Sequence, residues 1–413
     1  MRLDKSSSER AKTAHPYTLP ENLIPSMQMA KSVYTLPGPY DTDEFITPKG
    51  RDAFFNTVWK VAFSSSRGGI RLEGPAPEWS RESGGEGGSH PSNVLGYGYP
   101  LGGLSFTGDS AVVFTADSPV QSGFISLQTV LSCELWKMGQ LKPGDEVRFS
   151  QCSWTQAMAL EKELDRFLEY VSEAIASEAS NAVSLALGTI SGPVPGTSVL
   201  YERPAGEDGL PRFIIRQAGD KGVVCDFGSQ VFDLNVRVRI QQLVQTIFDN
   251  PPHGVERVSR PHTMSVFVAF NPNSIDQSRA ISTLIELEAS CSGAPVLRGK
   301  TIYLPMVFDA EENQRSTEKY METQRPYATY LPDNIDFIRR NNGLETRDDV
   351  LDAVNGVPFL VLASTGLMGL PIIIQVDPRK RLTVPKSNPS RSATPAGALG
   401  TGGNTSAIYP VES

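Results

Sequence analysis

Cysteine is scarce in this sequence and never closely spaced. The four cysteines of the 413-residue chain lie far apart, without a CxxC or CxH pattern, at Cys133, Cys152, Cys225 and Cys291. Zinc sites need closely spaced ligands, so a metal site is not expected. A disulfide framework is disfavoured by the same spacing. Since a free cysteine behaves as a small apolar side chain, we expect four reduced and mostly buried thiols.

Long apolar runs and basic stretches are also lacking. The longest apolar segment, 357–374, is interrupted by two prolines and two glycines, unlike a membrane-spanning helix. Residues 1–23 contain no apolar core of a secretory signal. The formal net charge is −8, and no basic stripe alternates with aromatic residues. These features argue against membrane and nucleic-acid partners, and we expect a cytoplasmic protein.

Several motifs that define enzyme classes are missing. The chain has no GxxxxGK[ST] phosphate loop, no HExxH motif and no glycine fingerprint between a strand and a helix. Two serine patterns fit poorly. Residues 64–69 hint at an amidase signature but lack an upstream catalytic lysine, and GTISG at 188–192 has its serine at the wrong offset for a nucleophile elbow. We therefore expect no ATP site in this chain.

Changes in composition divide the chain into six segments. Apolar runs bounded by turn residues predict strands, and three- and four-residue apolar spacing predicts helices. We expect a mobile N-terminal segment at 1–30, a β-rich module at 31–150, a connector helix at 151–187, a Gly/Pro linker at 188–210, an α+β domain at 211–298 and a second β-rich module at 299–413.

The expected elements follow from the same patterns. Strands are predicted at 33–36, 58–63, 69–73, 111–115, 123–128, 146–150, 213–217, 221–227, 265–270, 300–310, 358–363 and 372–376. Helices are predicted at 43–56, 128–139, 153–186, 234–248, 274–289, 311–322 and 333–353. In the segment 153–186 an apolar stripe lies opposite charged residues, which indicates an amphipathic helix that serves as a connector or as a partner-docking surface. The α+β domain is expected to carry helices on an antiparallel sheet.

A glycine-rich run at 68–109 is the most informative stretch of the chain. Glycine permits tight turns and close backbone approach, so such runs build hairpin ends and loops that line ligands. The run contains His90, one of four histidines, followed by Pro91, Ser92 and Asn93. A histidine and an asparagine on such a loop could bind a small amide or carboxylate. The alternative is a turn in which Ser92 and Asn93 cap the local backbone.

Two further groups have the same two interpretations. Thr107-Gly108-Asp109 ends a strand, and its aspartate either contributes to a site or forms an Asx turn. Lys137 and Lys142 flank a turn in LWKMGQLKPGD and are either electrostatic groups of a site or surface charges.

Many ordered motifs resemble one family. The first half contains GIRL at 69–72, Trp79, GGE at 84–86, HPSN at 90–93, FTGD at 106–109 and ELWKMGQLKPGDEVRF at 134–149. The second half contains FIIRQAGDKGVVCDFG, SVFVAFNP, YLPMVFD, YLPDNIDFI, DPRKRL and NPSR. In this order, the motifs are similar to the carboxyltransferase region of biotin-dependent urea carboxylase (urea amidolyase). The families of allophanate hydrolase subunits 2 and 1 share that region.

The resemblance implies a mixed α+β, β-rich fold. It consists of cyclophilin-like β-barrel modules and a small ferredoxin-like α+β domain, joined by the long amphipathic helix. It also implies transfer of a carboxyl group from carboxybiotin to urea or a related small amide. Biotin would be presented in trans by a biotin carboxylase and a biotin carrier, with no covalent attachment here and no metal.

The resemblance also implies site residues. The catalytic candidates are His90, Asp109 and Lys142. The substrate-binding candidates are Asn93, Tyr97, Tyr99, Thr107 and Gly108. Candidates for the biotin cleft are Asp333, Asn334, Arg379 and Asn388.

The chain also departs from the family. After HPSN and one apolar residue the family reads His-Asp-Asn-Ala-Tyr, and this chain reads Leu95-Gly96-Tyr97-Gly98-Tyr99. Lys380 stands where the family has histidine, and Ser387 where it has tyrosine. A site without its amide-binding groups should bind urea less tightly. Relatives also extend beyond both ends and carry ATP-dependent and biotinyl domains. The alternatives are therefore a non-catalytic or regulatory amide- or protein-binding relic, or a 5-oxoprolinase-type subunit that works with an ATP-using partner.

Overall fold

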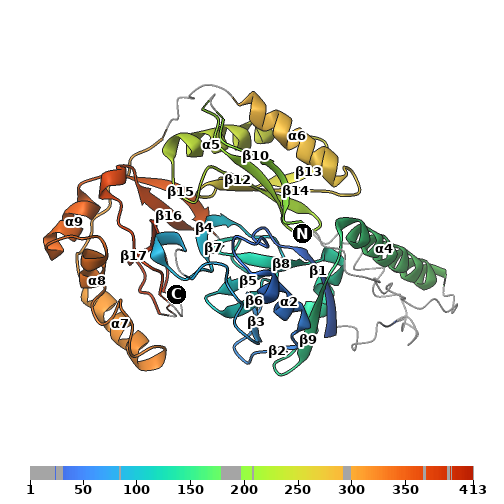
Figure 1. Ribbon diagram of the computed structural model, residues 1–413, viewed down its shortest axis with the longest axis horizontal. Helices are drawn as coiled ribbons and strands as arrows, with labels where there is room; N and C mark the ends of the chain where they lie inside the picture. The colour runs from blue at the N-terminus through green and yellow to red at the C-terminus, as the bar shows by residue number, and fades with distance from the viewer. Residues whose placement is uncertain are drawn as a thin grey trace, which may run out of the picture.

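The structure is a computed structural model (Figure 1). It describes residues 24, 31–82, 85–177, 197–206, 209–291, 299–365, 369–387, 391 and 393–412. The segment predicted to be mobile, 1–30, lies outside these ranges except for Ile24. The mixed, β-rich fold predicted from the sequence is confirmed, with one closed barrel and several open sheets.

The barrel forms the first part of the chain. Its seven strands follow the order β1-β8-β5-β6-β3-β2-β9, and the parallel pairing of β1 with β9 closes it. Their bounds are β1 Ser32–Pro37, β2 Trp59–Val61, β3 Ile70–Glu73, β5 Gly103–Thr107, β6 Ser110–Val113, β8 Ser126–Val130 and β9 Glu146–Gln151. Because alternate residues of a strand point to one side, the interior collects large side chains. Helix α2 (Pro48–Asn56) adds Phe54, which packs on Trp59 and Phe149.

The helix predicted at 128–139 is wrong. Strand β8 continues to Val130 because residues 128–130 pair with β1 in the barrel. A 3₁₀ turn (η4, Ser132–Glu134) and one short helix (α3, Leu135–Met138) follow. The chain turns here because the Ser132 N–H donates to the Asp220 carboxylate of the next domain.

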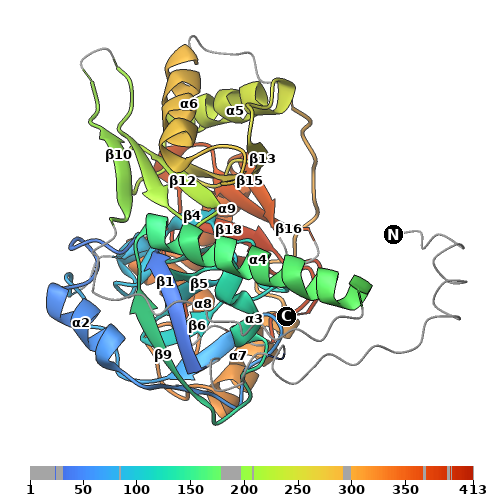
Figure 2. The same cartoon turned by 90° about the vertical axis from the view of Figure 1, so that its right-hand side faces the viewer.

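The long amphipathic helix is confirmed as α4 (Trp154–Ser177), which lies across the outside of the barrel (Figure 2). Its first turns pack Ala157 and Leu160 against Leu36 of β1. Farther along, Leu168 and Ile175 are exposed. The remainder of the predicted helix lies outside the described residues.

The α+β domain is an antiparallel sheet with two helices. Its strands are β10 (Val199–Arg203), β11 (Phe213–Gln217), β12 (Gly222–Phe227), β13 (Val255–Val258) and β14 (Ser265–Phe270), in the order β10-β11-β12-β14-β13. Helices α5 (Leu234–Asp249) and α6 (Gln277–Ser290) cover one face (Figure 1). Strand β10 lies in the segment predicted as a linker, and β13 was not predicted.

The central strands of this sheet, β11, β12 and β14, are buried on both faces. Along β12, Val223 and Cys225 pack with the helices, whereas Val224 joins the core of the barrel. Phe267 of β14 also enters the barrel core. The strict alternation of the strand thus ties the α+β domain to the barrel.

The last part of the chain combines helices with an open sheet. Its elements are α7 (Glu311–Thr323), α8 (Asn334–Asn341), α9 (Arg347–Asn355), β15 (Phe359–Thr365), β16 (Leu370–Gln375), η5 (Pro378–Lys380), β17 (Leu399–Gly402) and β18 (Thr405–Ile408). Within the described residues the sheet has four strands, β15-β16-β18-β17, and does not close. The predicted second barrel is therefore not formed by these residues.

Two further element predictions in this part are wrong. No strand forms at 300–310, where residues 301–307 have no regular secondary structure and pair with no strand of the described residues. The single helix predicted at 333–353 is two helices, because Gly343 between them has φ of 64°. That backbone conformation ends a helix and suits glycine.

A two-stranded sheet lies where the three parts meet. It pairs β4 (Asn93–Gly98) with β7 (Gln121–Phe124) beside the barrel (Figure 1). Leu95 of β4 is buried in one cluster with Met264 of the α+β domain and with Leu362 and Ile374 of the last sheet. The loop before β4 contains a 3₁₀ turn, η3 (Glu86–Gly88). This junction positions the site.

Candidate functional site

A large cavity opens at the junction of the three parts. Its volume is about 1380 Å³. Its walls come from the β4–β7 pair, from Thr263 before β14, and from the last part between Pro305 and Tyr409. A cavity of this size at a domain junction is where small ligands usually bind.

One end of the cavity is polar. We call this the polar end and define it by Gly96, Gln121, Gly123, Thr263 and Lys386, all of which line the cavity. The Lys386 Nζ donates to the Gly123 carbonyl at 3.3 Å and lies 5.3 Å from the centre of the Phe124 ring. The Lys386 ammonium group thus lies against β7, the strand that also carries Gln121.

A buried histidine lies behind this end. The Nδ1 atom of His262 hydrogen-bonds the Oε1 atom of Gln121. The ring is 5% exposed, and its Nε2 atom has no hydrogen-bond partner among the described residues. Burial, together with the nearby Arg237 cation, lowers the pKa of His262 to about 3. The imidazole is therefore neutral at physiological pH. This pair was not predicted from the sequence, because a lone histidine after a proline matches no motif.

The neutral state of His262 makes stability depend on pH. In the unfolded chain its pKa is about 6.5, so below that pH the unfolded state takes up a proton that the folded state refuses until about pH 3. Stability is therefore lost as the pH falls through this range. When the pH is lowered from 7 to 5, the free energy of unfolding of the native chain should fall by about 2 kcal/mol more than that of His262→Asn. Guanidinium unfolding at both pH values measures this, and equal losses would refute it.

The predicted catalytic pair His90 and Asp109 is brought together by the structure. Their Nε2 and Oδ1 atoms are 3.3 Å apart, and Trp79 Nε1 donates to the same Oδ1 at 3.0 Å. On the other side of the ring, His90 Nδ1 and Ser92 Oγ are 3.0 Å apart. None of these side chains lines the large cavity among the residues described. Instead, they fix the loop 85–93.

The loop 85–93 contacts residues of the last part of the chain that line the cavity. The Ser89 hydroxyl accepts a hydrogen bond from the backbone N–H of Lys386 at 3.2 Å. Gly87 approaches residues 383–384 and 403 so closely that an added Cβ would stand 3.0 Å from Gly403. The loop 85–93 therefore positions Lys386 rather than lining the cavity itself.

The predicted substrate-binding residues lie around the same loop and the barrel core. Asn93 is buried, with its Oδ1 atom 3.4 Å from Ser92 Oγ. Gly108, at the β5–β6 turn beside Thr107, donates its N–H to Ser92 Oγ. Tyr97 and Tyr99 are buried in the barrel core, and both hydroxyls donate to the Phe124 carbonyl. In this conformation none of the five lines the large cavity.

Lys142 is not brought to this site. It is exposed on the turn before β9, where its backbone N–H donates to the Asp145 carboxylate. Lys142 precedes β9 and Asp109 precedes β6, and strands β2 and β3 lie between β9 and β6 in the barrel. Its position is that of a surface charge at a turn.

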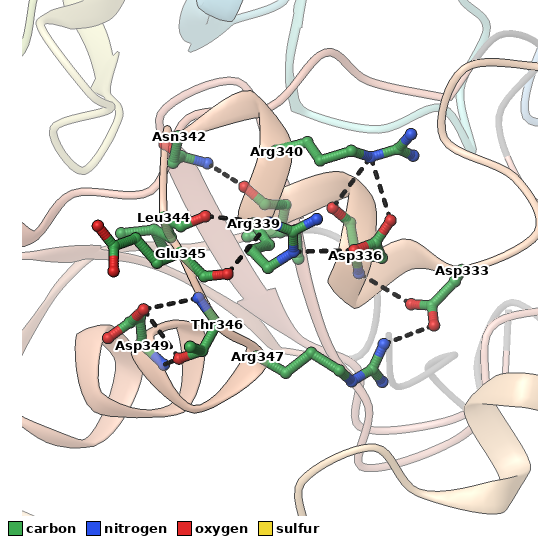
Figure 3. Close-up of polar contacts among 11 residues, drawn as sticks. Asp333, Asp336, Arg339, Arg340, Asn342, Leu344, Glu345, Thr346, Arg347 and Asp349 are labelled. Carbon is green, nitrogen blue, oxygen red and sulfur yellow. Dashed lines mark hydrogen bonds and ion pairs between the residues drawn. The ribbon is translucent and has the colours of Figure 1, made fainter.

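Two predicted biotin-cleft residues do line the cavity. Asp333 and Asn334 lie at the start of α8. Figure 3 shows that the Asp333 carboxylate caps the helix by accepting from the Asp336 N–H and pairs with Arg347 at 2.5 Å. Asn334 donates to Thr317 Oγ1 at 2.8 Å. Arg379 is exposed and pairs with Asp377, and Asn388 lies outside the described residues.

The described residues contain no group of three His, Cys, Asp or Glu side chains suited to a metal ion. In the same ranges, no helix has the length and apolarity needed to cross a membrane. The four cysteines are free and buried.

Comparisons with known proteins agree with this architecture. The family described as carboxyltransferase domain, subdomains A and B, matches residues 1–151, and subdomains C and D match residues 213–413. A putative urea carboxylase of Emericella nidulans is 34% identical over 425 aligned positions, which cover 98% of this chain and 34% of that protein. The urea amidolyase of Lachancea kluyveri is 34% identical over 99% of this chain and 22% of its own length.

A solved structure is also similar. The urea carboxylase of Kluyveromyces lactis superimposes with a TM-score of 0.81 at 32% identity, over 95% of this chain and 34% of that one. The chain thus spans about a third or less of the length of these relatives. Two matched domain families, an alignment along nearly the whole chain and a shared fold lead to one conclusion: the chain belongs to the carboxyltransferase-domain family of urea carboxylase and urea amidolyase.

Proposed function

We propose that the chain provides the site at which a carboxyl group passes from biotin to urea or a related small amide. The observation that carries the proposal is the large cavity, because residues of both matched domains line it. A reaction between two ligands needs one space that admits both. We further propose that a biotin carboxylase forms the carboxylated biotin and that a separate carrier presents it in trans.

The residues of the cavity fit a biotin group. Its volume of about 1380 Å³ exceeds that of most small-molecule sites, which leaves space for a ring system and a second small ligand. Apolar side chains such as Val307, Phe337 and Ile372 line one part, and amide and ammonium groups line the polar end. When bound, biotin would supply the activated carboxyl group.

The chain's own residues would bind and orient the two ligands and would stabilise the negative charge that develops during transfer. Carboxyl transfer develops negative charge on oxygen atoms, and fixed donors or cations stabilise such charge most when they are already in place. Lys386 supplies a cation that is held from two sides, since its backbone N–H donates to Ser89 and its Nζ to Gly123. We propose that His90 and Asp109 act indirectly, by holding the loop that positions Lys386.

Blocking the polar end tests this assignment. Ser387 lines the cavity beside Lys386, so Ser387→Trp should lower the affinity for biotin and for urea by at least tenfold. Leu101→Trp is the matched control, because Leu101 is exposed on the turn before β5 and is not a cavity residue. Ligand-observed NMR titrations with biotin and urea measure both affinities. Unchanged binding by folded Ser387→Trp would place the ligands elsewhere.

The same titrations separate the alternatives. A non-catalytic, amide-binding role gives binding at the cavity but no carboxyl transfer when carboxylated biotin carrier is added. A 5-oxoprolinase-type role gives binding of a lactam in preference to urea.

A further inference from the structure

We propose that Gln121, oriented by His262, donates its amide N–H group to the carbonyl oxygen of a urea-type N–C(=O)–N group bound at the polar end. Urea and the fused ring of biotin share that group, and the inference rests on the proposed function. Gln121 is the contacting residue, and His262 is a positioning residue.

The hydrogen bond with His262 fixes the direction of the Gln121 side-chain amide. Its Oε1 atom lies 2.5 Å from His262 Nδ1, and an amide oxygen can only accept. The neutral imidazole must therefore carry its proton on Nδ1. With its oxygen held by the histidine, Gln121 turns its NH₂ group away from the ring. Since Gln121 lines the cavity, this group is available to a ligand carbonyl.

The Gln121 and His262 side chains are held in place by burial. Both side chains are buried, at 8% exposure for Gln121 and 5% for His262. Gly98, which pairs with Gln121 across the two strands, leaves room for the ring, because a Cβ there would stand 2.6 Å from His262 Nε2. A donor held before the ligand arrives loses little entropy on binding.

Burial and a neighbouring cation keep the His262 imidazole neutral. Arg237 lies nearby and is buried, and its guanidinium donates to the Leu362 carbonyl. A second cation beside it would be unfavourable, so the imidazole stays neutral and serves as a donor of fixed direction. Lys386, the cation of the polar end, belongs to the cavity wall.

Variants of matched shape test the inference. In His262→Asn, the side-chain NH₂ takes the place of Nδ1–H and can still donate to Gln121, whereas His262→Leu keeps the volume and has no donor. Gln121→Leu removes the NH₂ group itself. We expect Gln121→Leu and His262→Leu each to weaken ligand binding about 5- to 30-fold, and His262→Asn to stay within threefold of the native chain.

Separate NMR titrations with urea and with free biotin identify whether Gln121 contacts the carbonyl of urea or that of the biotin ring. The Gln121 side-chain ¹⁵N–H signals should also shift on addition of that ligand in the native chain and in His262→Asn. If the native chain binds and Gln121→Leu, still folded by a cooperative melt, binds equally well, the inference is wrong and the proposed function stands. Equal loss in His262→Asn and His262→Leu would make the histidine merely structural and overturn its positioning role. A native chain that binds neither ligand overturns both proposals.

Discussion

Lys386→Met lowers the rate of carboxyl transfer to urea by about 10²- to 10³-fold, with a smaller effect on the affinity for urea. Methionine keeps most of the length of the side chain and removes its charge. A fixed donor aimed at developing negative charge typically contributes this much to turnover. Lys386 is the cation of the polar end, held by its contacts with Ser89 and Gly123.

The measurement is the rate of urea carboxylation with carboxylated biotin carrier as donor. Lys60→Met is the control, since Lys60 is exposed on β2 and does not line the cavity. It should transfer at the native rate. Loss of activity in both variants would point to net charge or docking of the carrier rather than to the polar end.

Glu288→Ala destabilises the chain by about 3–5 kcal/mol. The Glu288 side chain is fully buried at the end of α6, where it pairs with Arg203 at 2.5 Å and Arg239 at 2.6 Å. Burial opposes its ionisation, but the hydrogen bonds from the two arginines outweigh burial and lower the pKa of Glu288. Removing the carboxylate leaves two guanidinium groups without their shared counter-charge.

The control for this prediction lies on the same helix. Glu286 is exposed and stands 3.9 Å from Arg279, so Glu286→Ala should change stability by less than about 0.5 kcal/mol. Guanidinium unfolding is the suitable measurement, because urea is the proposed ligand. Similar midpoints for the two variants would show that the buried network contributes little to folding.

Much of the fold could be predicted from local patterns. The stripe of α4 and most short strands of the barrel are visible because their apolar residues repeat with the period of a helix or a strand. The failures have tertiary causes. Residues 302–307 are apolar enough for a strand, yet no strand in the described part of the chain pairs with them, and Tyr303 and Val307 are exposed. Strand β13 was missed because its central residues, Glu256 and Arg257, are polar on an edge strand.

The candidate site was less visible than the fold. Of the three catalytic candidates that the family resemblance implied, His90 and Asp109 lie together and Lys142 lies apart. The cavity is assembled from residues as distant as Gly96, Thr263 and Lys386, and no spacing in the sequence connects them. The hydrogen bond between His262 and Gln121 likewise joins segments 141 positions apart, which local patterns do not connect.

Carboxyl transfer from a biotin carrier to urea can be followed directly. The purified chain is mixed with urea and a biotin carrier whose biotin bears a ¹⁴C-labelled carboxyl group, and label on urea is followed over time. We expect label on urea only when the chain is present, and loss of that label in Lys386→Met. If the folded chain leaves the label on the carrier at saturating urea, and transfers it to no other small amide, then the cavity is not a carboxyl-transfer site.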